Sequence, residues 1–333
     1  MGIKASVIIP NYNGKAYLKN CIDSLLKQTE TNFEIIIVDD FSTDGSFKEI
    51  KEYAETLCLE KNVMPTIKFK RHNNNHGFCK SVNDGILMAN SDYVILLNND
   101  TIVDADFVAV LLKSIKKSNN IFSVSSKMIS MHNKDVIDDA GDLYCILGWA
   151  FSPAKDKSVN LYNRREKIFA ACGGASIYRK KVFEEIGLFD ENHFAYLEDI
   201  DIGYRAKLAG YINVYEPNAL VYHLGSATSG SRHNAFKVFL SARNSIYLIY
   251  KNMPGLQILI NSPFLLCGIL IKIVYFIPKK LVKNYLEGIA SGVATCIKSK
   301  SKIFRVSFKE VPFSRFVEIE VEMLKNTFRR VIG

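Results

Sequence analysis

The sequence predicts an α/β protein in which a mostly parallel sheet is flanked by helices and followed by a helical C-terminal extension. Short apolar runs alternate with segments of helical spacing through the first hundred residues, which is typical of a doubly wound sheet. Basic and apolar residues then accumulate in the last third of the chain. With 333 residues, the chain can hold one large domain with an appendage, or two domains.

Four strands are expected in the first hundred residues, at 6–10, 33–40, 66–72 and 93–100. The segments between them repeat apolar residues at helical spacing, which predicts helices at 15–28, 44–60 and 78–90. Crossovers in such an arrangement are nearly always right-handed, and ligands collect at the carboxyl ends of the strands.

The later elements are less regular. In chain order they are a helix at 106–117, strands at 121–130 and 168–178, a helix at 198–209 closed by Gly210, two short strands within 210–225, and an amphipathic helix with a basic edge at 235–251. The change of character after Arg232 divides the chain into residues 1–230 and residues 231–333.

Unusual polar residues follow three of the four expected strands. They are Asn11 to Gly14 after the first strand, Asp39 and Asp40 after the second, and Asn98 to Asp100 after the fourth. Adjacent carboxylates at a ligand-binding edge can accept hydrogen bonds from a pyrimidine base or from ribose hydroxyls. A strand end followed by a helix cap is the alternative, and it explains Asp44 and Gly45 better than it explains Asp39 and Asp40.

Asp100 is a candidate metal ligand. Together with Asn98 and Asn99 it offers hard oxygen atoms, which Mg2+ and Mn2+ prefer while they also bind substrate phosphates. A plain turn explains the same three residues about as well. His223 becomes relevant only if the fold brings it to Asp100, because a lone histidine on a strand is more often structural.

Acidic residues gather at the start of the expected helix 198–209. Glu198, Asp199 and Asp201 lie within four residues, and Arg205 follows about one turn later. These acids can simply complement the helix dipole. Carboxylates packed in a cleft also raise one another's pKa, which suits one of them to act as a general base.

The last third of the chain carries the positive charge. The formal net charge is +9, but residues 231–333 hold 17 Lys and Arg against 5 Asp and Glu, and residues 1–230 hold 26 against 29. The asymmetry predicts an anionic partner surface. A membrane fits better than nucleic acid, because the same third is also the most apolar.

Residues 255–280 form the longest apolar stretch, which Asn261, Pro263 and Lys272 interrupt. A membrane-spanning helix needs about twenty mostly apolar residues. The interruptions favour a monotopic element that lies on a membrane, with a buried core or dimer element and a true span as the alternatives.

Cysteines and the N-terminus show no special signal. The seven cysteines have neither CxxC pairs nor metal-ligand spacing, so we expect reduced thiols that serve as small apolar residues. The N-terminus leads directly into the first expected strand, so we expect no signal peptide.

Read in order, these motifs resemble the family-2 glycosyltransferases of the GT-A fold, and among them the rhamnosyltransferase-like members that build bacterial cell-surface polysaccharides. The strings that carry the resemblance are VIIPNYNG, IIIVDDFSTDGS, NNNHGFCKSVNDGI, VILLNNDT, ACGGASIYRKKVFEEIGLFDENHFAYLEDIDIGYRAKLAGY and VYHLGSATSG. The resemblance implies a GT-A catalytic domain over residues 1–230 and a membrane-associating helical region over residues 231–333.

The resemblance also assigns a nucleotide-sugar site to the strand ends and to the loop and helix of NNNHGFCKSVNDG. The implied donor contacts are Pro10, Asn11, Asp39, Asp40, Asn75, Gly77, Asn83 and Asn99. The string LLNND occupies the position of the family's DXD metal motif, with Asn98 in place of its first acid. Asp100 would hold the divalent ion, Mn2+ or Mg2+, and His223 matches the family's late metal-side histidine.

Asp199 matches the family's general base, which takes the proton of the acceptor hydroxyl as that oxygen attacks the anomeric carbon. Nucleoside diphosphate leaves from the opposite face, so the configuration is inverted. The resemblance implies that Glu198 and Asp201 orient the base or the acceptor, and that Arg205 pairs with one of these acids. The glycines at 173 and 174, which let backbone approach a ligand closely, would lie near the acceptor or the diphosphate.

We therefore expect an inverting, metal-dependent hexosyltransferase of cell-wall or polysaccharide biosynthesis. The expected donor is dTDP-rhamnose, with UDP-linked galactose, glucose or N-acetylhexosamine as competitors. The acceptor is expected on a polyprenyl diphosphate at the cytoplasmic face of the inner membrane, where the protein would bind peripherally. A homodimer is possible, and no nucleic-acid partner is expected.

Two other classes compete with this interpretation. A nucleotide-binding scaffold that has lost catalysis is disfavoured by the intact Asp100, Asp199 and His223. A nucleotidyltransferase would be expected to carry a Gly-rich loop with Arg and Lys after the first strand, where this chain has NYNGKAYLKN.

Overall fold

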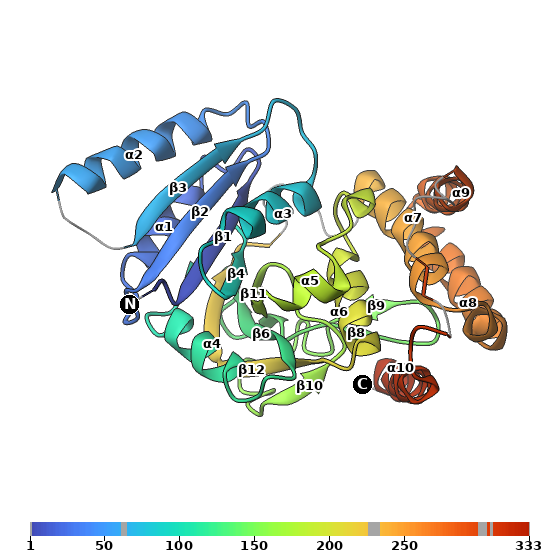
Figure 1. The fold of residues 1–333 in the computed structure, drawn as a ribbon. Coiled ribbons are helices and arrows are strands. Elements are labelled where there is room, and N and C mark those ends of the chain that lie inside the picture. Colours follow the sequence, from blue (N-terminus) through green and yellow to red (C-terminus); the bar gives the residue numbers. More distant parts are fainter. Residues whose placement is uncertain (1, 61–64, 226–233, 299–304, 307–308, 333) are drawn as a thin grey trace.

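In this computed structural model, the described residues form a central ten-stranded sheet (Figure 1). The structure describes residues 2–60, 65–225, 234–298, 305–306 and 309–332. The end of VYHLGSATSG at 226–230, and with it the boundary expected at residue 230, lies outside the described residues.

The N-terminal half of the sheet is parallel, as predicted. Its strands are β1 (Ala5–Asn11), β2 (Phe33–Asp39), β3 (Thr66–Arg71) and β4 (Tyr93–Leu97), in the spatial order β4-β1-β2-β3. The intervening helices are α1 (Leu18–Leu25), α2 (Ser46–Glu60) and α3 (Phe78–Met88). Asn11 pairs in register with Asp39, so the carboxyl ends of β1 and β2 lie side by side.

The second half of the sheet is mixed. Its strands are β5 (Thr101–Val103), β6 (Ile121–Ser130), β7 (Ile137–Asp139), β10 (Glu166–Ile168), β11 (Ala175–Arg179) and β12 (Ile212–His223), and β8 (Leu143–Tyr144) pairs separately with β9 (Ala150–Phe151). Strand β11 runs antiparallel between β4 and β6, and β12 runs parallel to β6. Pairing of β5 with β12 places His223 opposite Thr101, next to Asp100.

Two predictions about strands are wrong. Residues 212–223 form one strand rather than two, because both halves pair with β6 and a register shift between Glu216 and Leu220 absorbs Pro217. The strand expected at 168–178 begins only at Ala175. The preceding residues form the turn that carries the glycine pair.

The two faces of the sheet have separate cores. Val7 and Ile9 of β1 belong to the same buried cluster as residues of α1 and α4 (Phe107–Ile115), whereas Ile8 belongs to a cluster with residues of α3 and α5 (Val182–Ile186). This division follows from the alternation of side chains along a strand. Because both faces are covered, β1, β2 and β4 are mostly apolar rather than alternating.

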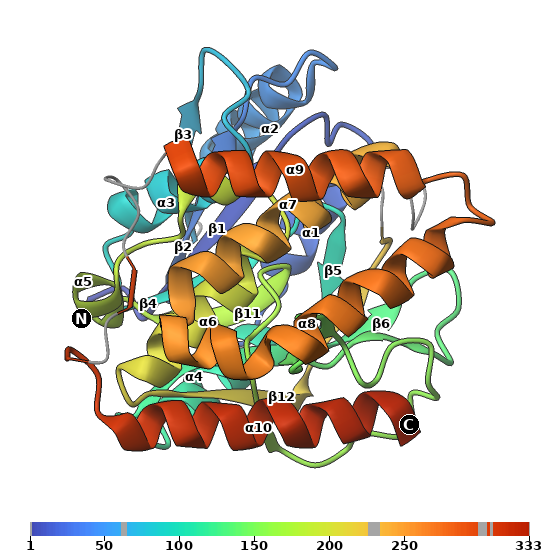
Figure 2. The ribbon, with the colours of Figure 1, turned by 90° about the vertical axis from the view of Figure 1, so that its right-hand side faces the viewer.

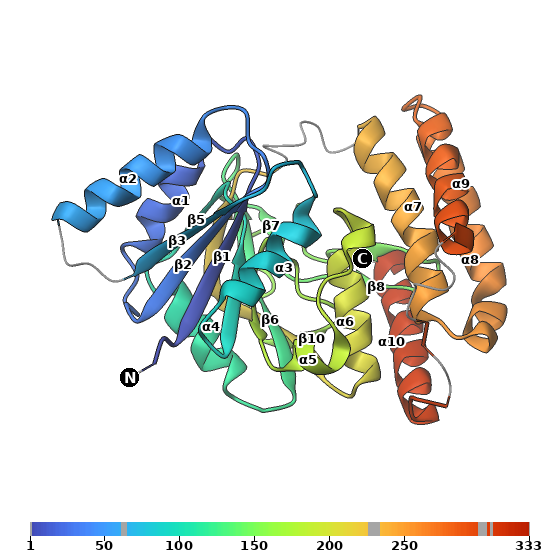
Figure 3. The same ribbon diagram turned by 45° about the horizontal axis from the view of Figure 1, so that its top comes forward.

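Among the described residues, four long helices follow α6 (Glu198–Leu208) and gather on one flank of the molecule (Figure 3). They are α7 (Ala235–Asn252), α8 (Gly255–Phe276), α9 (Val282–Lys298) and α10 (Phe313–Ile332). Figure 2 looks directly onto this layer. A third core cluster joins Tyr204 of α6 to Leu248 of α7 and Met323 of α10, so the C-terminal helices pack on the α/β part.

Candidate active site

A cavity of about 760 Å³ opens where the carboxyl ends of β1, β2 and β4 meet. The predicted site residues that line it are Pro10, Asn11, Asp40, Asn75, Gly77, Asn99, Asp100, Gly173, Gly174, Glu198, Asp199 and His223. All candidate residues lie in the described part of the chain, and those outside the lining are Asp39, Asn83, Asp201 and Arg205.

Asn11 organises the edge between β1, β2 and β4. Its Nδ2 donates to Asp39 Oδ1 at 2.8 Å, and its Oδ1 accepts from Asn99 Nδ2 at 2.8 Å. A Cβ at Gly14 would lie 2.3 Å from Asn11 Oδ1, so only glycine fits there. Asp39 is fully buried and also accepts from the Ser42 N–H at 3.1 Å. It orients Asn11 and does not line the cavity, contrary to the role expected for it.

Asp40 holds the loop that precedes α3. Its carboxylate accepts from the backbone N–H of His76 at 2.9 Å and of Gly77 at 2.7 Å, and it contacts His72 Nδ1 at 2.7 Å. His72 Nε2 in turn lies 2.8 Å from Asp84 on α3. His72 and Asp84 were not predicted from the sequence, where the one indication was a histidine at the end of an expected strand.

Asn75 and Asn83 have different positions in this loop and helix. Asn75 lines the cavity, and its Oδ1 accepts from the Gly77 N–H at 3.1 Å. Asn83 instead donates to the Phe189 carbonyl at 2.8 Å and accepts from the Phe189 N–H at 3.0 Å. Asn83 therefore ties α3 to the segment before α6 and does not reach the cavity.

Asp100 and His223 meet at the cavity because β5 pairs with β12. His223 Nε2 lies 3.2 Å from Asp100 Oδ1, and His223 Nδ1 lies 2.7 Å from Asp138 Oδ2. Burial lowers the pKa of His223, but hydrogen bonds and charges from Asp100 and Asp138 outweigh burial and raise it to about 9. Asp138 was not predicted from the sequence, because its segment has no clear hydrophobic period.

This pair fits a divalent cation. Adjacent ligands of an octahedral ion with bonds of about 2.1 Å lie about 3 Å apart. The separation of Asp100 Oδ1 and His223 Nε2 is close to that value. A metal-bound histidine usually directs its other ring nitrogen at a carboxylate, which Asp138 supplies here.

Four carboxyl groups surround the start of α6. Glu198, Asp199 and Asp142 line the cavity, and the Asp139 carboxylate lies within 4.8 Å of that of Asp142. Desolvation, followed by the charge of Asp199, raises the pKa of Glu198 to about 8. Desolvation also raises the pKa of Asp199 and of Asp142. A hydrogen bond with Asp142 opposes the effect of burial and lowers the pKa of Asp199.

A second group of possible metal ligands lies beside the carboxyl groups at the start of α6. Oxygens of Asp139 and Asp142 and the sulfur of Cys172 are within 4.8 Å of one another. Desolvation raises the pKa of all three groups, that of Asp139 to about 7. The Asp100 and His223 pair is the better cation site, because Asp100 Oδ1 and His223 Nε2 lie 3.2 Å apart and Asp138 occupies the other ring nitrogen of His223.

Asp201 and Arg205 form a buried ion pair outside the cavity. Asp201 Oδ2 lies 2.7 Å from Arg205 Nη2, which confirms that Arg205 pairs with an acid of this group. Arg205 also donates to the carbonyls of Ile186, Gly187 and Leu188. The pair fastens α6 to the chain after α5, whereas the sequence suggested contact with the base or the acceptor.

Gly173 and Gly174 let the turn that contains them approach β4 and α3 closely. The Gly174 carbonyl accepts from the Asn98 N–H at 2.8 Å, and a Cβ at Gly174 would lie 3.0 Å from Asn98 Nδ2. A Cβ at Gly173 would lie 3.3 Å from the Phe78 ring. Larger residues would therefore crowd the turn against β4 and α3.

Helix α7 also contributes to the lining, through Phe236, Lys237 and Ser241. Desolvation and the nearby charge of Lys155 lower the pKa of Lys237. The sequence of this helix showed only an amphipathic pattern with a basic edge, so these three residues carried no signal of a site.

Comparison with known proteins decides the family. The family model described as glycosyl transferase family 2 matches residues 6–187, more than half of the chain. The chain belongs to glycosyl transferase family 2. The resemblance found in the strand-end motifs is confirmed, and so is the expectation of a transferase enzyme.

Two curated relatives of this family-2 protein differ in how much they share with it. Glycosyltransferase GlyA of Streptococcus pneumoniae is 28% identical over 193 residues, which cover 55% of this chain but only 25% of GlyA. The N-acetylglucosaminyl-diphospho-decaprenol L-rhamnosyltransferase of Mycobacterium tuberculosis is 22% identical over 277 residues, covering 72% of this chain and 84% of that enzyme.

A solved structure shows the fold of this family-2 protein. The crystal structure of GalNAc-T7 with UDP, GalNAc and Mn2+ aligns with a TM-score of 0.59 and 19% identity, over 74% of this chain and 47% of that chain. This likeness, together with the parallel sheet and its flanking helices, confirms the expected GT-A fold.

Proposed function

We propose that this protein transfers a sugar from a nucleoside diphosphate to a hydroxyl group of a saccharide acceptor, with inversion at the anomeric carbon. The observation that carries the proposal is a single cavity lined by both the Asp100 and His223 pair and Asp199. The Asp100 and His223 pair suits a cation that binds diphosphate. Asp199, whose pKa is raised, suits the role of general base.

The nucleotide would lie against the strand-end side of the cavity. Asn11 and Asn75 line this side, and their side-chain positions are fixed by hydrogen bonds to neighbouring groups. Asp40 holds the backbone at His76 and Gly77, so it shapes this subsite as well as lining it.

Asp100 and His223 would hold Mn2+ or Mg2+, which neutralises charge on the leaving diphosphate when bound. Asp138 would keep His223 oriented, because it occupies the other ring nitrogen at 2.7 Å. The GalNAc-T7 structure, which contains Mn2+ and UDP, supports this assignment by likeness of fold.

Asp199 would accept the proton of the acceptor hydroxyl as that oxygen forms a bond to the anomeric carbon. Nucleoside diphosphate leaves with the electron pair of the broken carbon–oxygen bond. Asp142 would donate a hydrogen bond to Asp199 and so limit the rise of its pKa. Glu198 Oε2 is buried without a hydrogen-bond partner among the described residues, which suits it to accept from an acceptor hydroxyl.

We infer dTDP-rhamnose as the donor, with UDP-hexoses and UDP-N-acetylhexosamines as the competing donors. The likeness to the mycobacterial rhamnosyltransferase over 84% of that enzyme supports rhamnose. Its name describes an acceptor on a decaprenyl diphosphate, which supports a polyprenyl-diphosphate-linked acceptor for this protein as well.

Helix α8 supports binding of the protein to a membrane, because its polar side chains face the protein and its apolar side chains are exposed. The polar residues Gln257 and Asn261 face the protein, where they donate to Glu320 of α10 at 2.8 and 3.0 Å. Its outer face is apolar and exposed, at Leu256, Leu259, Ile260, Phe264, Leu266, Leu270, Ile271, Val274 and Tyr275. Within the described residues, α8 is the one helix long and apolar enough to cross a membrane.

We propose that α8 lies on the anionic cytoplasmic face of the inner membrane. Lys279 and Lys280 follow the helix and are exposed, which complements anionic lipid headgroups. The net charge of +12 in residues 231–333 points the same way. A protein bound there would meet an acceptor carried on a polyprenyl diphosphate.

The proposed function is tested by comparing the wild-type protein with Asp199→Asn. With Mn2+, dTDP-rhamnose should raise the Tm more than UDP-sugars do, because a ligand that binds only the folded state stabilises it. EDTA should abolish this shift and the transfer. Asp199→Asn should keep the shift but lower turnover by about 10²–10⁴-fold, as expected for a lost general base.

The matched control is Asp92→Asn. Asp92 is exposed and directly precedes the first residue of β4, at the opposite end of the strand from the cavity, so this variant should retain full turnover. Undiminished turnover of Asp199→Asn would remove Asp199 as the base. Full activity in EDTA would exclude the cation at Asp100, and a larger Tm shift with a UDP-sugar would reassign the donor.

A further inference from the structure

The segment that leads into α6 has an unusual backbone. Phe194, Tyr196 and Leu197 have φ values of 63°, 71° and 65°, in a region that residues other than glycine rarely adopt. All of residues 194–197 line the cavity. Leu197 directly precedes Glu198 and Asp199, so the course of this segment decides where the acids of α6 begin.

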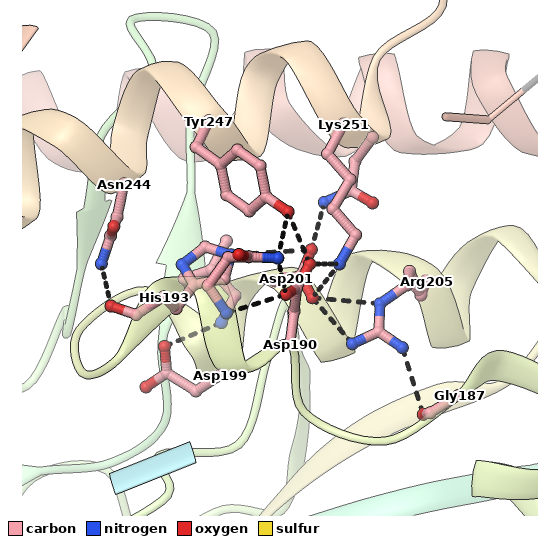
Figure 4. Close-up of polar contacts among 12 residues, drawn as sticks. Gly187, Asp190, His193, Asp199, Asp201, Arg205, Asn244, Tyr247 and Lys251 are labelled. Carbon is pink, nitrogen blue, oxygen red and sulfur yellow. Dashed lines mark hydrogen bonds and ion pairs between the residues drawn. The ribbon is translucent and has the colours of Figure 1, made fainter. Parts of the chain in front are cut away.

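One side chain of α7 donates hydrogen bonds to the backbone carbonyls of this segment. Asn244 Nδ2 donates to the carbonyl of His193 at 2.9 Å (Figure 4). It also donates to the carbonyls of Ala195 and Tyr196, both at 2.8 Å. Asn244 is fully buried, so no water replaces these bonds. Three carbonyls that converge on one amide would be left facing each other if the amide were removed.

Arg243 fixes the orientation of that amide. Its Nη1 donates to Asn244 Oδ1 at 2.8 Å, so the amide nitrogen must point at the three carbonyls. The same guanidinium nitrogen donates to the Asn192 carbonyl at 2.6 Å. Neighbouring residues of α7 thus contact one continuous stretch of backbone.

Further along α7, other polar side chains hold both ends of the stretch. Lys251 Nζ lies 2.7 Å from Asp190 Oδ2 and 3.0 Å from Asp201 Oδ2 (Figure 4). Tyr247 donates to Asp190 at 2.8 Å, and Asn252 donates to Asp201 at 2.7 Å. One carboxylate precedes the 194–197 segment and the other follows it, so α7 fastens the segment on both sides.

We propose that α7 positions the base, and that Asn244 is the positioning residue that sets the backbone of residues 194–197 and thereby the place of Asp199. The proposal rests on the proposed function for the role of Asp199, although the contacts themselves do not. It gives the C-terminal region a part in catalysis that is separate from membrane binding.

The test compares Asn244→Ala with a matched control, Asn326→Ala. Asn326 is a buried asparagine on α10 whose Nδ2 donates to the Tyr144 carbonyl at 3.0 Å, outside the cavity lining. Both variants lose a buried amide-to-carbonyl contact from a C-terminal helix. Hydrogen exchange of residues 193–200 is measured together with kcat and donor KM, well below the Tm of each variant.

Asn244→Ala should speed amide exchange in residues 193–200 by about tenfold or more, because the segment opens locally. We expect kcat to fall about 100-fold while donor KM changes less than about threefold, the pattern of a lost transition-state arrangement. Asn326→Ala should lower the Tm without either change.

Arg243→Met is the milder variant, because it keeps Asn244 and removes only the group that orients it. It should change exchange and kcat in the same direction by a smaller factor, and it decides the question if Asn244→Ala does not fold. Control-like exchange and kcat in the Asn244 and Arg243 variants would overturn the proposal. A wild-type protein without transfer would refute the proposed function instead, while the exchange comparison still tests the positioning role.

Discussion

Two acids on α6, two positions apart, serve different purposes. Asp199 lines the cavity, and desolvation raises its pKa. Asp201 is buried, yet the charges of Arg205 and Lys251 outweigh the effect of burial and hold its pKa well below the usual value. At 3.6 residues per turn, such positions point about 200° apart, so one rotation of the helix cannot bring both to the cavity.

Asp142 should set the acid limit of turnover. In Asp142→Ala the hydrogen bond that lowers the pKa of Asp199 is lost, so Asp199 stays protonated to higher pH. A base must be deprotonated to act, so the acid limb of the kcat profile should move to higher pH by about one unit. The measurement is kcat against pH for the variant and the wild type.

Asp142→Asn is the control for this prediction, because the amide still donates a hydrogen bond to Asp199. Its acid limb should stay close to that of the wild type. A limb that moves to lower pH in Asp142→Ala would contradict the assignment, since it would mean that Asp142 is charged and raises the pKa of Asp199.

At the scale of elements, α8 has its polar side chains turned inward. The buried positions Gln257, Asn261, Leu265 and Gly268 repeat at helical spacing and form one stripe against the protein. Close packing requires glycine in this stripe, because a Cβ at Gly268 would lie 2.2 Å from the Leu147 carbonyl oxygen. The remaining, wider face is apolar, which is the reverse of a helix on the surface of a protein in water.

Charges on this face should weaken membrane binding. Leu259 and Leu270 are 69% and 54% exposed, so Leu259→Glu with Leu270→Glu should leave the fold intact. We expect co-sedimentation with vesicles that contain anionic lipid to fall by about tenfold or more, because each charge opposes burial in the interface. Leu87→Glu, at an equally exposed leucine of α3, is the control.

Unchanged co-sedimentation of the double variant would remove α8 from the membrane contact. Equal loss in Leu87→Glu would point to a general effect of negative charge instead. Neutral vesicles provide a second comparison, in which the contribution of Lys279 and Lys280 should disappear.

At the scale of the whole molecule, the C-terminal helices share a core with the α/β part. Phe316, Ile319 and Met323 of α10 are buried in the same cluster as Tyr144 and Phe169. The last helix in the sequence therefore covers the segments that precede the glycine pair. Stability of the site and of the C-terminal region should be linked as a result.

Ile319→Ala should reveal this link. Ile319 is 2% exposed, and truncating a buried isoleucine destabilises a protein by about 2–5 kcal/mol. Urea unfolding followed by Trp149 fluorescence and by far-UV circular dichroism should shift to lower urea by the same amount with both probes. Val321→Ala, at a residue that is 45% exposed, should change the free energy of unfolding by less than about 0.5 kcal/mol.

A circular dichroism transition that moves while the Trp149 transition stays in place would contradict this prediction. In that case α10 would unfold on its own, and the α/β part would be independent of it.

The sequence by itself determined the parallel half of the sheet and the location of the site. The hydrophobic period of a strand or helix is a local property of the sequence. Strands that alternate with helices pair in parallel. The polar residues that follow β1, β2 and β4 therefore had to meet at one edge of the sheet. Asp40 and Asp100 follow from that rule. The ordered motifs then added Asp199 and the family.

Only the tertiary structure decided which polar side chains reach the cavity and which support it. Asp138 meets His223 across 85 positions of the chain, and Asn244 meets the carbonyls of His193, Ala195 and Tyr196 across about fifty. Such contacts depend on strand pairing and on how each helix is rotated as it packs. No local pattern encodes either, which is why Asp39 and Asp201 were expected in the cavity while Asp142 and Asn244 went unnoticed.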